Sequence, residues 1–126
     1  MEELRTNRYW YTAELVRWVD ADTVELFVDV GFETWVKVTA RVHGIDAPEM
    51  HKVKHDSEEY AKGIAAKEFA EQTIPPGVMV VVNTFQDKKG KYGRWLADIY
   101  FEDSVGKPIN LSEHLIENGH AVRKEY

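Results

Sequence analysis

The stretch from Val24 to Val42 reads VELFVDVGFETWVKVTARV, and its pattern sets the architecture of the chain. Valine and leucine alternate with charged and aromatic residues on both sides of Gly31. Such a period of two is typical of half-buried strands, and a glycine between two such runs indicates a turn. We therefore predict two antiparallel strands here. The alternation from Tyr9 to Val19 adds a preceding strand, which completes a three-strand meander.

Beyond Pro48 the periodicity changes. A helix capped by Asp56 or Ser57 should run to about Thr73, where a Pro-Pro-Gly sequence ends it. The later elements are two strands and a short helix, at about Val78–Thr84, Trp95–Phe101 and Leu111–Asn118. This order predicts an α+β, mainly β fold: a five-stranded OB-type Greek-key barrel with a helix between its third and fourth strands and a short C-terminal helix. A half-open α+β sandwich fits the periodicity nearly as well.

Two details of the core follow from the same patterns. The strand that begins at Val78 is apolar enough to be buried on both faces. Trp95 falls on the inward face of the last long strand, whereas the other three tryptophans are expected at barrel ends or in surface contacts. Tryptophans can also stack on single-stranded bases, but packing is the interpretation that we prefer for most of them.

Length and composition limit the possible classes of protein. The 126 residues are expected to form a single domain, 1–126, with 44% hydrophobic residues and no cysteine. The longest apolar run, Val78–Val82, is too short for a membrane span, so no membrane partner is expected. The N-terminus has no secretory signal, which leaves a cytoplasmic protein or a mature form that has lost its signal. The formal net charge of −6 argues against a general nucleic-acid coat protein.

Charged side chains gather in three short stretches near predicted strand ends: VDADTV at 19–24, RVHGIDAPEM at 41–50 and KKGKYGR at 88–94. Each has an ordinary structural explanation. Aspartate is a good turn former, a charged loop after Pro48 can simply be solvated, and a basic hairpin loop is usually a solvated surface. Arg41 and Arg94 are stronger indications of a functional site, because the alternation places both outside the core on separate strands.

Together these side chains could carry out one kind of chemistry. Asp22 and Asp46 offer the hard oxygen ligands that Ca²⁺ or Mg²⁺ takes. Glu49 could hold or deprotonate a water molecule. Arg41 and Arg94 could clamp a phosphate and stabilise charge that develops during in-line attack. These are the groups required to hydrolyse a phosphodiester, although the sequence pattern alone does not bring them together.

In the order VDADTV, RVHGIDAPE and KYGRWLADIY, the three stretches resemble the signature segments of the staphylococcal nuclease (thermonuclease-like) family. The resemblance extends from about Val16 to Val122. It implies an OB barrel that hydrolyses DNA and RNA with little sequence preference, and Ca²⁺ as the cofactor. A nuclease-like OB module that binds nucleic acid or a protein partner without cutting is the alternative.

The resemblance also implies a role for each matching residue. Asp22, Asp46 and the backbone carbonyl of Ala47 match the calcium ligands, and Asp20 matches a supporting acid beside the metal. The residues that match the catalytic and substrate-binding groups are Arg41, Glu49 and Arg94 for catalysis, and Lys91 and Tyr92 for contact with a terminal phosphate. His51 and His55 are four residues apart, but with no obvious third nitrogen or sulfur ligand we do not expect a transition-metal site there.

Overall fold

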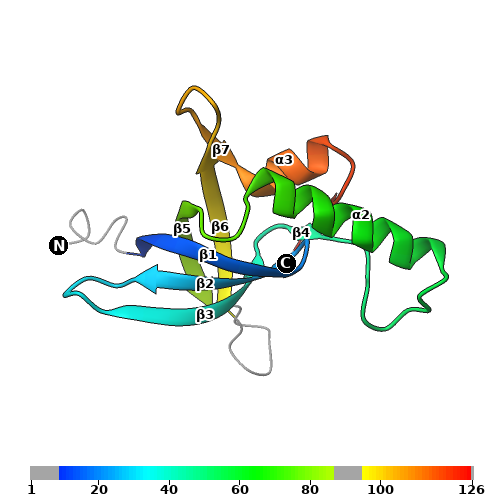
Figure 1. Cartoon of the computed structure of the whole chain (residues 1–126), viewed down its shortest axis with the longest axis horizontal. Coiled ribbons are helices and arrows are strands. Elements are labelled where there is room, and N and C mark those ends of the chain that lie inside the picture. Colours follow the sequence, from blue (N-terminus) through cyan, green and yellow to red (C-terminus); the bar gives the residue numbers. More distant parts are fainter. Residues whose placement is uncertain (1–8, 87–94, 126) are drawn as a thin grey trace.

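The alternating stretches of the sequence form the strands of a closed barrel in the computed structural model, which describes residues 9–86 and 95–125 (Figure 1). The five barrel strands are β1 Trp10–Asp20, β2 Thr23–Asp29, β3 Trp35–Val42, β5 Met79–Gln86 and β6 Trp95–Glu102. All neighbours are antiparallel except β3 and β6, which pair in parallel through Ala40–Val42 and Trp95–Ala97 and so close the barrel. The predicted mainly β barrel is confirmed, and the half-open sandwich is wrong.

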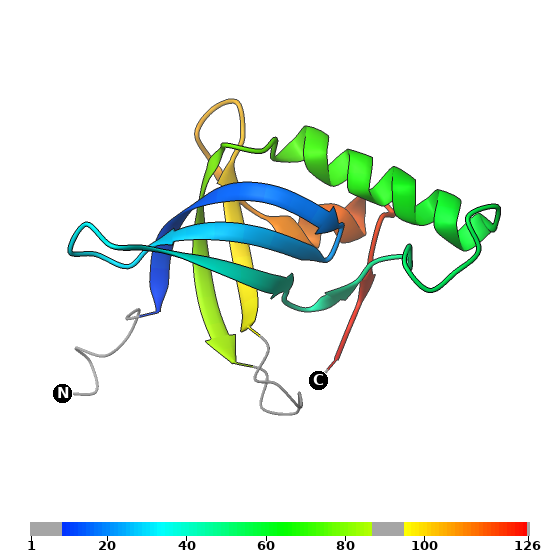
Figure 2. The same ribbon diagram turned by 60° about the horizontal axis from the view of Figure 1, so that its bottom comes forward.

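The predicted long helix is α2, Glu58–Thr73, and it follows β3 as expected. Ser57 caps it, because the hydroxyl of Ser57 accepts a hydrogen bond from the backbone N–H of Tyr60 at 3.1 Å. Ala70, together with Ile74 just after the helix, belongs to the hydrophobic core. The C-terminal half of α2 therefore covers one end of the barrel, while its N-terminal half extends past the barrel (Figure 2).

Four shorter elements complete the fold: β4 Ile45–Asp46, β7 Pro108–Asn110, α3 Leu111–Glu117 and β8 Val122–Arg123. The short C-terminal helix is α3, and Gly119 just beyond it has a φ of 77°, a conformation that glycine adopts without a steric penalty. β4 pairs with β8 in a separate two-stranded sheet, with Asp46 opposite Val122. This pairing holds the segment after β3 against the C-terminal segment. Among the described helices, none has the length and apolar character that crossing a membrane requires.

The core differs from the predicted one in three places, of which the first two are β5 and Trp95. β5 is buried on one face only, since Val80 and Val82 are enclosed while Met79 and Val81 are 47% and 44% exposed. Trp95 is 43% exposed and lies outside the core, contrary to the expected inward position. A regular alternation starting at Trp95 is broken because its neighbours Leu96 and Ala97 are both buried.

Trp18 lies in the core, contrary to the expected place at a barrel end or in a surface contact, and it fills the position that simple alternation along β1 gives to its neighbours. The pairing of β1 with β2 shifts register between Leu15 and Arg17, so the side chain that follows Leu15 into the core is Trp18. Trp18 is 2% exposed, and its indole nitrogen donates a hydrogen bond to the carbonyl of Ile74 at 3.1 Å. This contact fastens the end of α2 to the barrel.

Candidate active site

The carboxylates and the arginine from the first two charged stretches meet at a surface pocket of about 320 Å³. The barrel register explains why they meet. Thr23 is opposite Arg41 in the β2–β3 pair, and the backbone N–H of Val42 donates to the carbonyl of Asp22 at 2.9 Å. The β1–β2 turn and the end of β3 therefore lie side by side. The segment after β4 completes the pocket, whose charged lining consists of Asp20, Asp22, Arg41, Asp46, Glu49 and Lys52, with His51 beside them.

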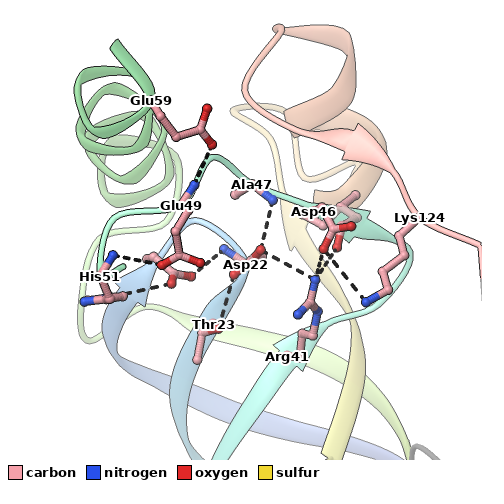
Figure 3. A network of polar contacts seen from close by, with 11 residues as sticks. Asp22, Thr23, Arg41, Asp46, Ala47, Glu49, His51, Glu59 and Lys124 are labelled. Atoms are coloured by element: carbon pink, nitrogen blue, oxygen red, sulfur yellow. Dashed lines mark hydrogen bonds and ion pairs between the residues drawn. The ribbon is translucent and has the colours of Figure 1, made fainter. Parts of the chain in front are cut away.

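Arg41 points toward both Asp22 and Asp46 (Figure 3). Its Nη2 donates to the carboxylate of Asp46 and, at 3.3 Å, to the backbone carbonyl of Ile45. The same nitrogen lies 3.7 Å from Oδ2 of Asp22. Its Nε is buried and meets no acceptor among the described residues. The guanidinium of Arg41 thus lies between two carboxylates, and its Nε–H has no acceptor among the described residues.

Asp22 is the most buried acid of the pocket, with 9% of its surface exposed. Its carboxylate accepts hydrogen bonds from the backbone N–H of Ala47 at 2.9 Å and from the hydroxyl of Thr23 at 3.2 Å. Burial by itself raises the pKa of Asp22, but the side chain of Asp20, the Ala47 N–H and the charge of Arg41 outweigh burial and lower it. Asp22 is therefore held in its ionised form.

Asp20 behaves in the opposite way. Burial, a hydrogen bond with Asp22 and the negative charge of Asp22 raise the pKa of Asp20 to about 7. Its Oδ1 accepts from the backbone N–H of Asp22 at 3.1 Å, and its Oδ2 lies 3.7 Å from Nε2 of His51. The two acids of the turn therefore differ in charge state. Asp22 carries the negative charge, while Asp20 stabilises that charge through the hydrogen bond between their side chains.

Glu49 is held at the rim of the pocket by its own loop and by α2. Its carboxylate accepts from the backbone N–H of His51 at 2.8 Å, and this hydrogen bond is the main reason that the pKa of Glu49 is lowered. Its backbone N–H donates to the carboxylate of Glu59 at 2.9 Å (Figure 3). No pattern in the sequence indicates this contact, because acids in the first turn of a helix are already explained by the helix dipole.

The donors present suit a hard cation such as Ca²⁺. Carboxylate oxygens of Asp22 and Asp46 line the same pocket and share one positively charged partner, Arg41. No set of three or more His, Cys, Asp or Glu side chains within 9–86 and 95–125 is arranged as a metal site. In this structure the guanidinium of Arg41 is the positive charge that offsets the two carboxylates. The residues therefore fit a cation in chemistry, and a cation would compete with Arg41 for them.

The remaining predicted site residues either lie outside the described part of the chain or have other neighbours. Arg94, Lys91 and Tyr92 lie outside the described residues, so their roles stay predictions. His51 and His55 have different neighbours: His51 approaches Asp20, whereas the ring of His55 stacks on Tyr60 with centroids 4.5 Å apart. Lys124 is an addition to the prediction, since its Nζ lies 3.9 Å from the Asp46 carboxylate.

Comparison with known proteins agrees with this barrel. Residues 39–126 match the family of staphylococcal nuclease homologues, and the chain belongs to that family. It is 34% identical to an uncharacterized protein, MJ1439, of Methanocaldococcus jannaschii over 92% of this chain and 60% of the relative. It is 31% identical to the endonuclease YhcR of Bacillus subtilis over 88% of this chain and 9% of the relative. The chain thus spans less than two thirds of each of these relatives.

Proposed function

We propose that this chain hydrolyses phosphodiester bonds of DNA or RNA in a calcium-dependent reaction. The observation that carries the proposal is the position of Arg41, which joins Asp22 and Asp46 in a pocket that Glu49 also lines. Membership of the staphylococcal nuclease family supports it, as does the likeness to a protein named as an endonuclease. Little sequence preference is part of the proposal because the resemblance to the family implies it.

In this proposal the groups that would hold Ca²⁺ are Asp22, Asp46 and the carbonyl of Ala47. The cation would supply positive charge that polarises a phosphoryl oxygen. If Asp46 served as a metal ligand, the donors of Arg41 that now meet it would be available to bind the phosphate. The unpartnered Nε of Arg41 fits this role, because bidentate binding of a phosphate uses two guanidinium N–H groups.

Glu49 orients the attacking water and accepts a proton from it. Its lowered pKa keeps the carboxylate ionised and ready to accept, and the N–H of His51 fixes its direction. Arg41, together with Arg94 from the basic stretch, stabilises the charge that develops on the phosphoryl oxygens. Lys91 and Tyr92 are assigned to a neighbouring phosphate. Asp20 supports Asp22 and takes no direct part.

The test is cleavage of single-stranded DNA and RNA in Ca²⁺, with and without a chelator, by the wild type and by Glu49→Gln, Arg41→Ala and Arg94→Ala. Loss of one transition-state contact should reduce kcat by about 10²- to 10³-fold, or about 2.7–4 kcal/mol. Lys37→Ala serves as a control, because Lys37 lies on β3 outside the pocket. Cleavage that ignores the chelator, or that survives Arg41→Ala and Arg94→Ala unchanged, would contradict the mechanism.

The competing function is a domain that binds nucleic acid or a protein without cutting. One observation favours it: Arg41 is engaged by Asp46, and the described acids do not form a metal site as they stand. The same experiment separates the two functions. A non-catalytic domain should bind single-stranded nucleic acid equally well in Ca²⁺ and in chelator, and should leave it intact.

A further inference from the structure

The first half of β3 is an open strand edge within the described part of the chain. β3 pairs with β2 along almost its whole length, but it pairs with β6 only through Ala40–Val42. The N–H of Val42 donates to the carbonyl of Asp22, just before β2, while the N–H of the next residue, His43, donates to β6. Successive backbone groups of a strand therefore alternate between the two neighbours.

The free backbone groups of this edge belong to Trp35 and Lys37. Counting back from His43 in steps of two reaches both residues, so their N–H and C=O groups point away from β2. No described residue pairs with them on that side. Both residues are exposed, and the turn between β2 and β3 projects away from the barrel (Figure 1, Figure 2). A row of free backbone donors and acceptors is the surface that another β-strand binds.

Exposed apolar side chains surround the same edge. Trp35 is 40% exposed, and its ring stacks on that of Phe27 of β2 with centroids 5.4 Å apart. On the other face of this hairpin, Val30 and Val36 are also exposed, Val36 by 41%. A cluster of exposed apolar side chains is typical of an interaction surface. The edge therefore offers a partner strand both backbone hydrogen bonds and apolar contact.

The partner strand that fits this edge is the same edge of a second copy. Two edges related by a twofold axis pair antiparallel, and their outward-pointing groups must face each other. When Trp35 lies opposite Lys37 of the second copy, the free groups of both residues are used on both chains. Each lysine then meets a tryptophan, whose face attracts an ammonium group. Val36 lies opposite Val36 of the second copy on the other face.

The two neighbouring registers fit less well. Lys37 opposite Lys37 would place like charges across from each other, which is destabilising, and it would extend to Thr39, next to the point where β6 begins to pair. Trp35 opposite Trp35 would instead require pairing by Glu33, which lies in the turn with a φ of 60° and outside β3. A lysine on an exposed edge usually opposes pairing between copies. Here Lys37 selects one register.

We propose that two copies of this chain associate through β3, with Trp35 of each opposite Lys37 of the other. The two barrels then share one continuous sheet across the twofold axis. The surface is small, so the association belongs to the weak, transient class of interfaces. It does not depend on the proposed nuclease activity.

The same register accounts for two other exposed aromatic side chains. Phe32 in the turn is fully exposed, and its φ of 54° is uncommon for a bulky residue. In the proposed dimer Phe32 of one copy lies level with Ala40 of the other. Ala40 pairs with Trp95 of β6, and Trp95 is itself 43% exposed. The dimer thus brings together two aromatic residues that a single copy leaves in solvent.

Single cysteines test this register directly, because the chain has none of its own. The two Val36 positions form a non-hydrogen-bonded pair with Cα atoms about 4.5 Å apart, a distance that a disulfide can bridge. Phe32→Cys is the control for random collision, since Phe32 is more exposed than Val36 but lies far from its own copy. In a glutathione redox buffer, Val36→Cys should cross-link at least about tenfold faster than Phe32→Cys or Lys37→Cys.

Sedimentation velocity measures the association of the unmodified protein, from about 1 µM to about 1 mM. The average mass of the wild type should rise toward that of a dimer, and Trp35→Ala should require at least about tenfold more protein for the same rise. Trp10→Ala is the matched control, because Trp10 is 38% exposed on β1, and it should behave as the wild type.

Three results would overturn the proposal. One is a wild type that stays monomeric over the whole concentration range, and another is equal cross-linking of all three cysteine variants. The third is a monomer that binds single-stranded DNA less tightly after Trp35→Ala, which would assign the exposed aromatic surface to nucleic acid. Fastest cross-linking of Lys37→Cys would likewise contradict the register.

Discussion

At the scale of single residues, Asp22 is the acid on which calcium binding should depend most. Asp22→Asn removes its charge but keeps an oxygen that can accept from the backbone N–H of Ala47, so the fold should persist. Calcium at a hundred times its Kd should raise the free energy of unfolding of the wild type by about 2.7 kcal/mol. Thermal unfolding in Ca²⁺ and in EDTA measures this gain, which Asp22→Asn should lose. Asp56→Asn, an exposed acid outside the pocket, is the control, and an equal gain in all three proteins would rule out this site.

Glu59 is the residue that we expect to position Glu49. Glu59→Ala removes the acceptor for the Glu49 backbone N–H, whose hydrogen bond is 2.9 Å long, and should lower kcat about tenfold, or about 1.4 kcal/mol. Glu59→Gln retains an acceptor oxygen and should restore most of the rate. Steady-state kinetics of the two variants, beside Glu68→Ala elsewhere on α2, measure the difference. If Gln and Ala at position 59 reduce kcat equally, the hydrogen bond has no positioning role.

The sequence predicted the members of the site better than their contacts. Asp22, Arg41, Asp46 and Glu49 were chosen from their chemical types and from a family resemblance, and the structure brings all four to one pocket. The bond of Arg41 to Asp46 could not be predicted, because it depends on the path of the chain between β3 and β4. The contact of Glu59 joins a turn to a helix ten residues away, a relation that no local pattern encodes.

At the scale of secondary structure elements, the fit of α2 against the segment before it depends on Gly63. A Cβ at this position would lie 2.4 Å from Cγ of Met50, and 3.1 and 3.3 Å from the carbonyl oxygens of Pro48 and Glu49. Alanine is the better helix former by about 1 kcal/mol, but overpacking costs about 1–3 kcal/mol. Gly63→Ala should therefore lower the free energy of unfolding slightly and displace Glu49, with a loss of about tenfold in kcat.

The control for this prediction separates stability from position. Ala61→Gly on the exposed side of α2 should also lower the free energy of unfolding, by about 1 kcal/mol, without touching the Glu49 loop. Urea unfolding and kcat are measured for both variants. A Gly63→Ala protein with the stability of Ala61→Gly and with wild-type kcat would show that α2 does not position Glu49.

The elements also show where alternation predicts well and where it does not. β2 follows it, since Val24, Leu26 and Val28 are all buried. β1 departs from it after Leu15, because a register shift against β2 sends Trp18 inward. Such a shift leaves no mark in the sequence, since it is fixed by the pairing of two strands and not by either strand alone.

At the scale of the whole molecule, charge is unevenly distributed. The formal net charge is −6, yet the substrate of the proposed reaction is itself a polyanion. Acidic residues gather on α2, at Glu58, Glu59, Glu68 and Glu71. Among the described lysines, Lys52 lines the pocket and Lys124 approaches Asp46. Attraction of a strand must therefore come from local cations near Arg41, while the rest of the surface opposes approach.

This balance predicts how binding should respond to salt and to charge reversal. Glu68→Lys and Glu71→Lys each change the charge by +2, so the double variant has a formal net charge of −2 in place of −6. Neither residue lines the pocket of Arg41. Affinity of the Glu49→Gln protein for a single strand should fall as salt rises, because each neutralised phosphate adds about 0.7 to the slope of log K against log salt. The reversed protein should bind several-fold more tightly at about 0.05 M salt, and the two curves should converge by about 0.5 M, where screening is short-ranged. Anisotropy titrations at four salt concentrations measure both curves. An affinity that does not change with salt would mean that the strand is not held by its phosphates, and curves that stay parallel would mean that the gain in affinity does not come from charge attraction.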